Sequence, residues 1–334
     1  MCISKRIMTA LTVLAVVSAG IFVFSKDAQA AKVVSVMFAG TEADTTPQSQ
    51  ALHEVANRLN KSGLFKVKVF TAGSLSGDTD DLVTQALQGA AIVVPSDPGR
   101  ISANQKVPEF GILMAPYVLK DYKVLDKLLQ TQLYLKWEKD FEKSGLKLVT
   151  NNWYNGMRHF VTNKKIDKPS DLKGLRIRGF GNTIGLSLAK ALGYAQTSIP
   201  AGEIFSAVQT KALDGCEIQI PFTYSNRLYE VLKYNNMTSH YMLTSSIVTG
   251  LKFFNSMTKE QQDLFVKTFR DVGTEFQAKV AAVEQDNLKQ MEAKGMIINN
   301  VDTAPFEKAV LPYYKDMGFS PEVKTELFKQ LGIK

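Results

Sequence analysis

The stretch FKVKVFTAGSLSGDTDDLVTQALQGAAIVVPS (65–96) indicates the fold class of this chain. Its first part, FKVKVF (65–70), alternates apolar and polar residues and therefore predicts a strand. GDTDDLVTQALQG (77–89) begins with helix-capping residues and ends at a glycine, which is typical of a helix. AAIVVPS (90–96) is a short apolar run, as expected for a strand buried on both faces of a parallel sheet. The order strand, helix, strand predicts an α/β fold.

The sequence on both sides continues this alternation. KVVSVMFAG (32–40) predicts a first strand, and an amphipathic helix is expected over 47–61. A long helical pattern at 121–143 precedes a second α/β unit. Separate strands are expected at 146–156 and 157–163, and another apolar strand over 245–254. The region 258–294 contains no proline and a single glycine, Gly273, so it predicts one or two very long helices.

We expect the two α/β units to form two lobes that are joined by more than one strand. The chain crosses between them near 153–156 and crosses back near 240–245. Such a connection forms a hinge, and the cleft between two lobes is a common place for a small ligand. The long C-terminal helix is expected to span both lobes. The predicted boundaries are residues 31–153 and 245–283 for lobe I, and 154–244 and 284–334 for lobe II.

The first thirty residues have the pattern of a secretory signal. Lys5 and Arg6 precede 18 residues without a charge (7–24), and the small-x-small site Ala28–Ala30 follows. We therefore expect residues 1–30 to be a signal peptide and the protein to be exported to the periplasm. An uncleaved membrane anchor is the alternative, because an apolar run of this length is near the minimum that spans a bilayer.

The charge balance argues against a nucleic-acid partner. The chain has a formal net charge of +8, and residues 1–30 contribute +2 of it, so the exported protein carries +6. Its lysines and arginines are scattered, without the basic runs that are typical of nucleic-acid binding. A modest positive field suits small anionic ligands instead.

Cysteine and histidine provide no pattern for catalysis or for a metal site. Cys2 lies in the predicted signal, so Cys216 is alone in the exported chain, and we expect it to be buried rather than nucleophilic. His53, His159 and His240 are far apart and lack metal-ligand spacing. The sequence therefore predicts no metal and no cofactor.

LRIRGFGNTIG (175–185) combines a strand, glycines and a helix start. A dinucleotide-binding turn has the same order, but it needs the spacing G-x-G-x-x-G, and the spacing here is one residue too long. Within the strand, Leu175 and Ile177 point to one face, and Arg176 and Arg178 point to the other. The function therefore depends on what these two arginines meet.

An arginine at the end of a strand can act as an anion clamp, because its planar fork can hold a carboxylate through two parallel hydrogen bonds. We expect Arg178, beside the helix start, to take this role, and Arg176 to face solvent or a polar neighbour. A secreted enzyme acting on a small acid is the alternative. The sequence lacks hydrolase motifs, and Asp214 and Glu217 point to opposite faces of a predicted strand, so no catalytic residue is predicted.

Three segments of the chain resemble the DctP-like solute receptors of TRAP (tripartite ATP-independent periplasmic) transporters. The order and spacing of their motifs are specific to that family, and a weaker likeness extends over the rest of the exported chain. The resemblance implies a two-lobed receptor, similar to other periplasmic binding proteins, that closes on a small organic anion and does no chemistry on it. The segments are WYNGMRHFVTNKKIDKPSDLKGLRIR (153–178), IPAGEIFSAVQTKALDGCE (199–217) and YEVLKYNNMTSH (229–240).

The resemblance also implies site residues. The carboxylate-binding arginine of the family falls on Arg178, and a second arginine that often contributes falls on Arg158. Ile218 stands where many members have asparagine, and Gln219 is the next polar residue along the chain. The remaining residues that are expected at the cleft are Glu42, Asp97, Trp153 and Phe180.

Two departures from the family pattern concern the ligand. Met157 and Ala201 stand where members often have aromatic residues, which makes the expected wall roomier and less polar. These changes argue against a sugar acid, although a carboxylate or a sulfonate opposite Arg178 stays compatible with a guanidinium. The implied partners are the membrane subunits of a TRAP transporter, and a monomer is expected. An exported receptor that serves another transporter or a sensor is the alternative.

Overall fold

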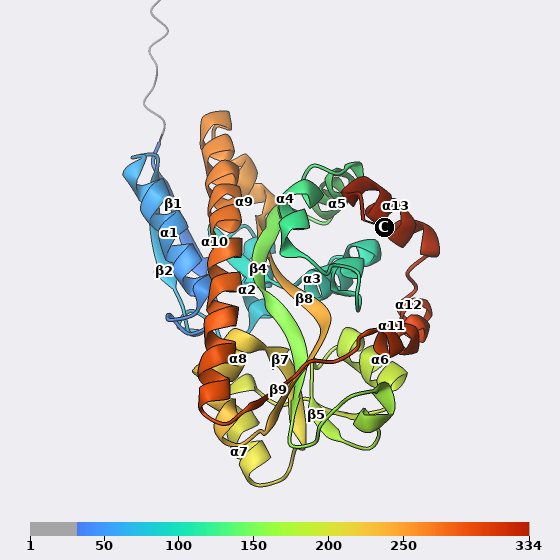
Figure 1. Cartoon of the computed structure of the whole chain (residues 1–334). Helices are drawn as coiled ribbons and strands as arrows, with labels where there is room; N and C mark the ends of the chain where they lie inside the picture. Colours follow the sequence, from blue (N-terminus) through green and yellow to red (C-terminus); the bar gives the residue numbers. More distant parts are fainter. Residues whose placement is uncertain (1–31, 334) are drawn as a thin grey trace, which may run out of the picture. The chain divides into compact units, whose positions relative to one another are not determined.

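One nine-stranded sheet runs through residues 32–333, the part of the chain that this computed structural model describes (Figure 1). Parallel and antiparallel pairs are both present, and the predicted α/β class is confirmed. The signal peptide predicted over 1–30 lies outside the described residues. In spatial order the strands are β2 (Phe65–Phe70), β1 (Val34–Ala39), β3 (Ile92–Ser96), β8 (Tyr234–Gly250), β4 (Leu146–Thr162), β7 (Gly215–Gln219), β5 (Arg176–Arg178) and β6 (Ala195–Thr197), and β9 (Ile297–Asn299) pairs with β8.

The first α/β unit forms where the sequence predicts it. Strand β1 pairs in parallel with β2 and β3, and the helices α1 (Pro47–Lys61) and α2 (Thr79–Leu87) connect these strands. The side chains of Thr46 and Asp78 cap the two helices by accepting hydrogen bonds from backbone N–H groups of the first turn. The predicted boundaries of this unit agree with the structure to within two residues.

Two long antiparallel strands, β4 and β8, connect the two lobes. Each has 17 residues, and their pairing runs from Leu146 opposite Gly250 to Thr162 opposite Tyr234. The sequence predicted two separate strands at 146–156 and 157–163. The structure has one strand with register shifts, which absorb the irregular stretch around Gly156 without ending the pairing.

Lobe II is built on β7, β5 and β6, which run in parallel. Strand β5 carries Arg176 and Arg178, and the helix that starts a few residues later is capped by Asn182, whose side chain accepts the N–H of Gly185. The helices of this lobe are α6 (Thr183–Leu192), α7 (Ile204–Gln209) and α8 (Ile220–Ser225).

Two expected elements of lobe I are corrected by the structure. The helical pattern at 121–143 is divided into α4 (Leu125–Leu128) and α5 (Gln132–Lys143), because Thr131 ends one turn and caps the next helix by accepting the N–H of Tyr134. The strand predicted over 245–254 ends at Gly250, and α9 (Leu251–Asn255) follows. The remaining helical segments of lobe I are α3 (Pro98–Asn104) and the 3-10 turn η1 (Pro108–Met114).

The long helix α10 (Lys259–Ala293) confirms the prediction for 258–294. It begins at a capping box, in which Thr258 and Gln261 exchange side-chain and backbone hydrogen bonds. Helix α10 packs against α1 of lobe I, α8 of lobe II and the connecting strand β4, so one rigid element contacts both lobes (Figure 1).

The C-terminal segment divides its contacts between the lobes. Helices α11 (Ala304–Ala309) and α12 (Leu311–Asp316) pack against α6, whereas α13 (Pro321–Leu331) packs against α4 and α5. The sequence assigned this whole segment to lobe II. We propose that α13 belongs to lobe I, and the other lobe boundaries stay predictions.

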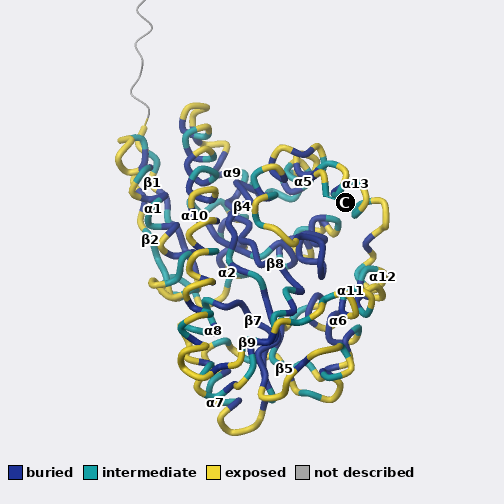
Figure 2. Tube along the Cα trace, viewed as in Figure 1, coloured by how far each residue is buried: buried dark blue, intermediate teal, exposed yellow. Residues whose placement is uncertain are grey.

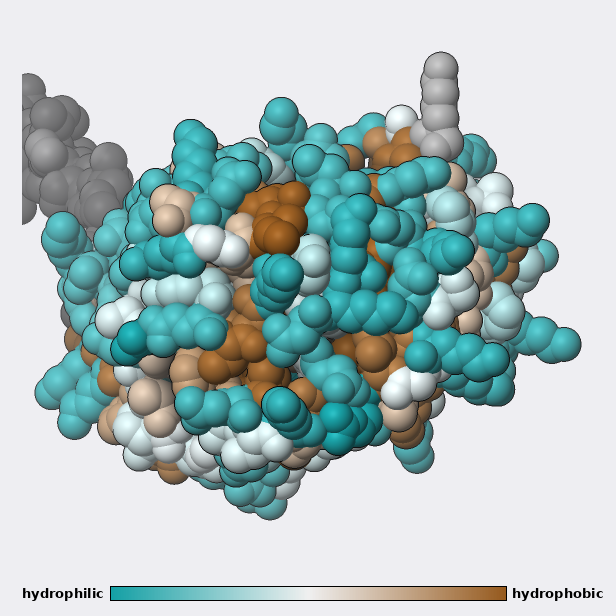
Figure 3. All heavy atoms as spheres, turned by 60° about the horizontal axis from the view of Figure 1, so that its bottom comes forward, coloured by the Kyte–Doolittle hydropathy of each residue, from teal (hydrophilic) through white to brown (hydrophobic). Residues whose placement is uncertain are grey.

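Burial follows the sheet. The connecting strands β4 and β8 are buried along almost all of their length (Figure 2). On the face that Figure 3 shows, hydrophobic side chains form small separate groups among hydrophilic ones. Within residues 32–333, none of the helices combines the length and the apolar character that crossing a bilayer requires.

Gly273 is the place where α10 lies closest to β4. A Cβ atom at this position would lie 2.3 Å from Asn152 Oδ1 and 2.7 Å from Trp153 Cδ1. Both residues hold the helix through hydrogen bonds, since Asn152 Nδ2 donates to the carbonyl of Arg270 and Trp153 Nε1 donates to that of Phe269. The glycine is therefore required by close packing.

We expect Gly273→Ala to destabilise the protein by about 1–3 kcal/mol, because the added methyl overpacks the contact between α10 and β4. Urea unfolding followed by tryptophan fluorescence measures the change. Ala278→Leu adds more bulk on the exposed face of the same helix and serves as the control, with an expected change within about 0.5 kcal/mol. Equal stabilities of Gly273→Ala and the wild type would contradict the packing argument.

Candidate functional site

The carboxyl ends of the parallel strands of both lobes point toward one short segment of β4. In lobe I, β3 ends at Ser96, which pairs with Ser246 of β8. In lobe II, β7 ends at Gln219, which pairs with Arg158 of β4. Residues 151–157 of β4 lie between these two edges. Ligands of open α/β sheets bind outside the carboxyl ends of the strands, so the candidate site lies here.

Arg178 ends strand β5 at this edge. Its side chain is half-buried, and Nε donates a 3.3 Å hydrogen bond to the carbonyl of Ile199. Burial and the neighbouring charge of Arg158 lower the pKa of Arg178. Among the seven arginines within residues 32–333, it is the only one without a carboxylate oxygen within 4.0 Å. Arg178 therefore presents a partly desolvated cation without a counter-ion.

Arg158 is close by but already paired. Its side chain is 3% exposed, and Nε and Nη2 donate to the two carboxylate oxygens of Glu217 at 2.6 and 2.8 Å. Nη1 donates to Gln219 Oε1 at 3.3 Å, and the Phe180 ring lies 4.0 Å below the guanidinium carbon. The protein itself thus provides a counter-ion for Arg158, and the expectation that this arginine also contacts a ligand stays a prediction.

Glu217 holds this pair in the charged state. Burial works to raise the pKa of Glu217, but Arg158 and a contact with His240 lower it, to about 2. His240 Nε2 lies 3.4 Å from Glu217 Oε2, and His240 Nδ1 lies 2.9 Å from Thr238 Oγ1. Burial lowers the pKa of His240, so this ring is neutral and orients the carboxylate without adding a charge.

The other predictions for this strand pair are confirmed. Arg176 is exposed and pairs with Asp214 at 2.9 Å, on the opposite side of the strand from Ile177. Cys216 is a free and fully buried cysteine, and burial raises the pKa of its thiol to about 12. Asp214 lies just before β7 rather than in it, and Asp214 and Glu217 pair with different arginines, Arg176 and Arg158.

Three residues expected at the cleft have structural roles here. Ile218 is buried in the apolar cluster formed with α8 and α10. Trp153 is buried against Phe269, and its Nε1 donates to that residue's carbonyl. Asp97 caps α3 and pairs with Arg100 at 3.3 Å. Ile218 and Trp153 thus lie in the core, and Asp97 caps a helix at the carboxyl edge of β3. The ligand contacts expected of these three residues stay predictions.

Glu42, in the loop after β1, lies at the carboxyl edge of lobe I. Desolvation by the surrounding protein raises the pKa of its carboxyl, and a hydrogen bond from Thr46 lowers it by less. Within residues 32–333, no lysine or arginine nitrogen lies within 4.0 Å of this carboxyl. Glu42 therefore lies at the carboxyl edge of lobe I without a basic partner among the described residues, and its place at the ligand stays a prediction.

A polar network that the sequence did not reveal lies on the same segment. Asn155 Nδ2 donates to Gln48 Oε1 at 2.8 Å and to Ser245 Oγ at 2.6 Å, and Ser245 Oγ donates to Gln48 Oε1. We call these three residues the amide network. They come from α1, β4 and β8, which are distant in sequence, so no local motif could have indicated the contact.

A second contact fastens the same segment to α10. Glu284 accepts a hydrogen bond from the Tyr154 hydroxyl at 2.6 Å and another from the backbone N–H of Met157 at 3.0 Å. Gly156 has φ +105, and a Cβ there would lie 2.8 Å from Glu284 Oε1. Burial raises the pKa of Glu284 to about 7, although the two hydrogen bonds each act to lower it.

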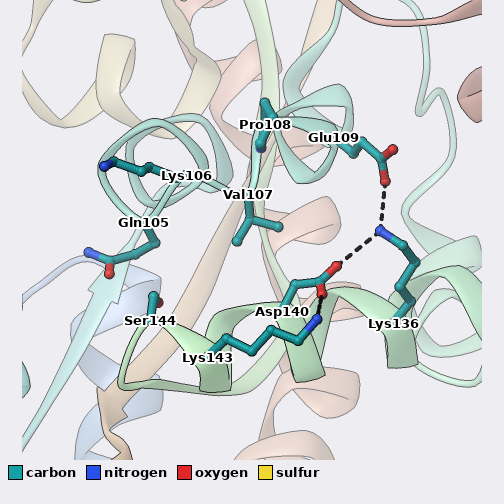
Figure 4. Close-up of a pocket in the computed structure, with 9 residues that line it drawn as sticks. All are labelled: Gln105, Lys106, Val107, Pro108, Glu109, Lys136, Asp140, Lys143 and Ser144. Atoms are coloured by element: carbon teal, nitrogen blue, oxygen red, sulfur yellow. Dashed lines mark hydrogen bonds and ion pairs between the residues drawn. The ribbon is translucent and has the colours of Figure 1, made fainter.

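Surface hollows elsewhere do not coincide with these residues. One, of about 440 Å³, lies between the α3–η1 corner and α5, and its charged groups satisfy one another: Lys136 pairs with Glu109 and Asp140, and Lys143 also pairs with Asp140 (Figure 4). A second, of about 530 Å³, lies beside the start of α10. Neither is lined by any residue that the sequence predicted for the site, and no His, Cys, Asp and Glu cluster within residues 32–333 could hold a metal ion.

Comparison with known proteins agrees with this geometry. Residues 38–320 match the family described as bacterial extracellular solute-binding protein, family 7. The chain belongs to this family. It is similar to a TRAP periplasmic solute-binding protein from Escherichia fergusonii, with 30% identity, a TM-score of 0.80, and coverage of 89% of this chain and 99% of that one. The predicted two-lobed TRAP receptor fold is thereby confirmed.

Two relatives of this chain carry the names of different ligands. The 2,3-diketo-L-gulonate-binding periplasmic protein YiaO of Escherichia coli is 26% identical over 90% of each chain. The C4-dicarboxylate-binding periplasmic protein DctP of Vibrio cholerae is 25% identical over 77% of each chain. Membership of the family therefore does not identify the anion, which has to be inferred from the residues of the site.

We expect Glu217→Gln to destabilise the protein by about 3–5 kcal/mol, because it leaves the Arg158 guanidinium buried without a counter-ion. Urea unfolding at neutral pH measures the loss. Asp214→Asn breaks the exposed pair with Arg176 and is the matched control, with an expected cost of about 0–1 kcal/mol. Similar losses for the two variants would show that the Arg158–Glu217 pair is not the buried contact described here.

Glu284 predicts a pH dependence of stability. The pKa of Glu284 is about 7 in the folded protein, whereas its ordinary value is 4.5. The folded state therefore binds the proton of this carboxyl more tightly than the unfolded state does. The contribution is fully present below pH 4.5 and is lost as the pH rises through 7, by about 3 kcal/mol in total. Denaturant unfolding between pH 5 and 8.5 should show this decline in the wild type and not in Glu284→Gln. The exposed Glu292→Gln on the same helix should behave like the wild type, and a decline that persists in Glu284→Gln would assign it to another group.

Proposed function

We propose that this protein captures a small organic anion in the cleft between its lobes and delivers it to the membrane subunits of a TRAP transporter. One observation carries the proposal: Arg178 is the arginine at the carboxyl edge that the protein leaves without a carboxylate partner. Membership of a family of solute-binding receptors supports the same role.

The chemistry of the two arginines supports an anionic ligand. Burying a cation is unfavourable unless an anion pairs with it, and Glu217 meets that need for Arg158. A ligand carboxylate would meet it for Arg178, through the bidentate hydrogen bonds that a planar guanidinium forms. Arg158 then acts as a positioning residue, since it holds Phe180 and Gln219 beside the ligand-binding arginine.

Hinge closure is the mechanism that the fold supports. Within residues 32–333 the lobes are connected by β4, β8, α10 and the C-terminal segment, and α3 of lobe I also contacts α6 of lobe II. At that contact a Cβ on Gly99 would lie 1.8 Å from Ile184 Cδ1, so a larger residue would force the Ile184 side chain to move. Closing the cleft excludes water, which strengthens the ion pair between Arg178 and the ligand.

The receptor role also accounts for the cellular setting that we propose. The predicted signal peptide would export the chain to the periplasm, where named relatives such as YiaO and DctP are described as binding their ligands. The protein would act as a monomer that binds without turnover, and no catalytic residue is assigned.

We expect Arg178→Ala to weaken anion binding by on the order of 100-fold or more, because it removes the charged partner of the carboxylate. Arg178→Lys should also weaken binding, since one ammonium cannot replace the planar fork. A thermal-shift screen of organic acids on the wild type selects the ligand, and calorimetry then measures its affinity for each variant.

Arg176→Ala is the matched control, because it removes an arginine two residues away whose charge Asp214 already neutralises. Its affinity should stay within about threefold of the wild type. Normal anion binding by Arg178→Ala would overturn the proposed function. An equal loss of affinity in Arg176→Ala would show that binding depends on the overall charge of the protein and not on Arg178 itself.

A further inference from the structure

The charges at the two carboxyl edges are unequal. Lobe II presents the unpaired cation Arg178, whereas lobe I presents the carboxyls of Glu42 and Asp97. The arginine beside them, Arg100, is already shared between Asp97 and Asp80, at 3.3 and 3.1 Å. A ligand that spans the cleft therefore meets one free cation on lobe II and none among these residues of lobe I.

The amide network lies beside the segment between the two edges. Asn155 is on that segment, in β4, and is half-buried, whereas Gln48 is at the start of α1, is 8% exposed and contacts Asn155 and Ser245. All hydrogens of the Asn155 amide nitrogen are used, by Gln48 and Ser245. The network therefore has two groups left within residues 32–333, the NH₂ of Gln48 and the carbonyl oxygen of Asn155.

These two groups form one donor and one acceptor, and this result does not depend on how the amides are oriented. If the oxygen and nitrogen of both amides are exchanged together, Asn155 accepts from Gln48 and Ser245. The groups left are then the NH₂ of Asn155 and the oxygen of Gln48, again one donor and one acceptor. In either arrangement the network matches a group that both accepts and donates.

We propose that the ligand is a monocarboxylate whose far end carries a hydroxyl, or another neutral group that both donates and accepts, rather than a second carboxylate. Its carboxylate pairs with Arg178, and its neutral end completes the amide network. This inference rests on the proposed function and narrows the ligand class beyond it.

The alternatives fit the same atoms less well. A second carboxylate only accepts hydrogen bonds, so it would face the free acceptor of the network and the Glu42 carboxyl without a cation to neutralise it. A plain alkyl end would leave the donor and the acceptor unpaired in a closed cleft. Sites built to hydrogen-bond a hydroxyl discriminate strongly against analogues that lack it.

A matched series of nine acids tests the proposal on the exported chain. For four, five and six carbons, the dicarboxylates succinate, glutarate and adipate are compared with the ω-hydroxy acids and the plain alkyl monocarboxylates of equal length. We expect calorimetry to show that, for at least one chain length, the hydroxy acid binds at least about tenfold tighter than the dicarboxylate and the alkyl acid of the same length. A dicarboxylate or a plain acid that binds as tightly as its hydroxy partner at every length overturns the proposal, and so does the absence of binding by all nine.

Gln48→Glu tests the network itself. The glutamate carboxylate can only accept hydrogen bonds, so in either arrangement the Asn155 amide turns its NH₂ toward it, and Ser245 donates to it as well. The contacts of the network are kept, while its free donor is lost. The preference for the hydroxy acid over the plain acid should fall at least about tenfold. Both ligands carry one negative charge, so the added charge cancels in this ratio.

Gln50→Glu is the matched control, because it adds the same charge on the same helix at an exposed side chain. Its preference should equal that of the wild type, and an unchanged preference in Gln48→Glu would overturn the assignment of the network. The two proposals fail separately. Tight binding of succinate that is lost in Arg178→Ala would contradict only the ligand class, whereas binding that survives Arg178→Ala would contradict the proposed function.

Discussion

Arg158 and Glu217 carry opposite charges in a place that water does not reach, and the rest of the site depends on their contact. Two hydrogen bonds to the carboxylate and one to Gln219 use the guanidinium, and the Phe180 ring covers one of its faces. An ion pair with this many hydrogen bonds keeps both groups charged, whereas either group alone would be too costly to bury. The neighbouring Arg178 has no such partner, so it is the cation that is left for a ligand.

The two lobes contribute differently to the cleft. Lobe II provides the cation, on a strand whose position is set by Ile177 in the core and by the buried ion pair beside it. Lobe I and the connecting strands provide neutral amides and an acidic rim. Under the proposed function, one lobe would orient the charged end of the ligand and the other its neutral end, so a complete set of contacts would exist only when the lobes are together.

The connecting segment is polar inside, which is unusual for the centre of a sheet. Thr150, Asn151, Asn152, Ser245 and Ser246 are all buried, and their side chains are hydrogen-bonded within β4 and β8 or to residues of α1 and α10. Buried polar groups need specific partners, so they hold the two strands in one arrangement. The proposed ligand site lies beside the same segment, so the proposal places the hinge and the specificity of the receptor in adjacent residues.

The sequence by itself determined the α/β class, the first strands and helices, the long helix α10 and the family, and it singled out Arg178 as the predicted anion-binding residue. Each of these depends on local periodicity, on capping residues or on a run of motifs, which are properties of neighbouring positions. Only the tertiary structure decided that Arg158 is neutralised by Glu217, that Trp153 and Ile218 are in the core, and that Gln48 joins Asn155 and Ser245. These contacts join residues that are 59 to 197 positions apart, and a charge or an amide has no local signature of the partner that folding will bring to it.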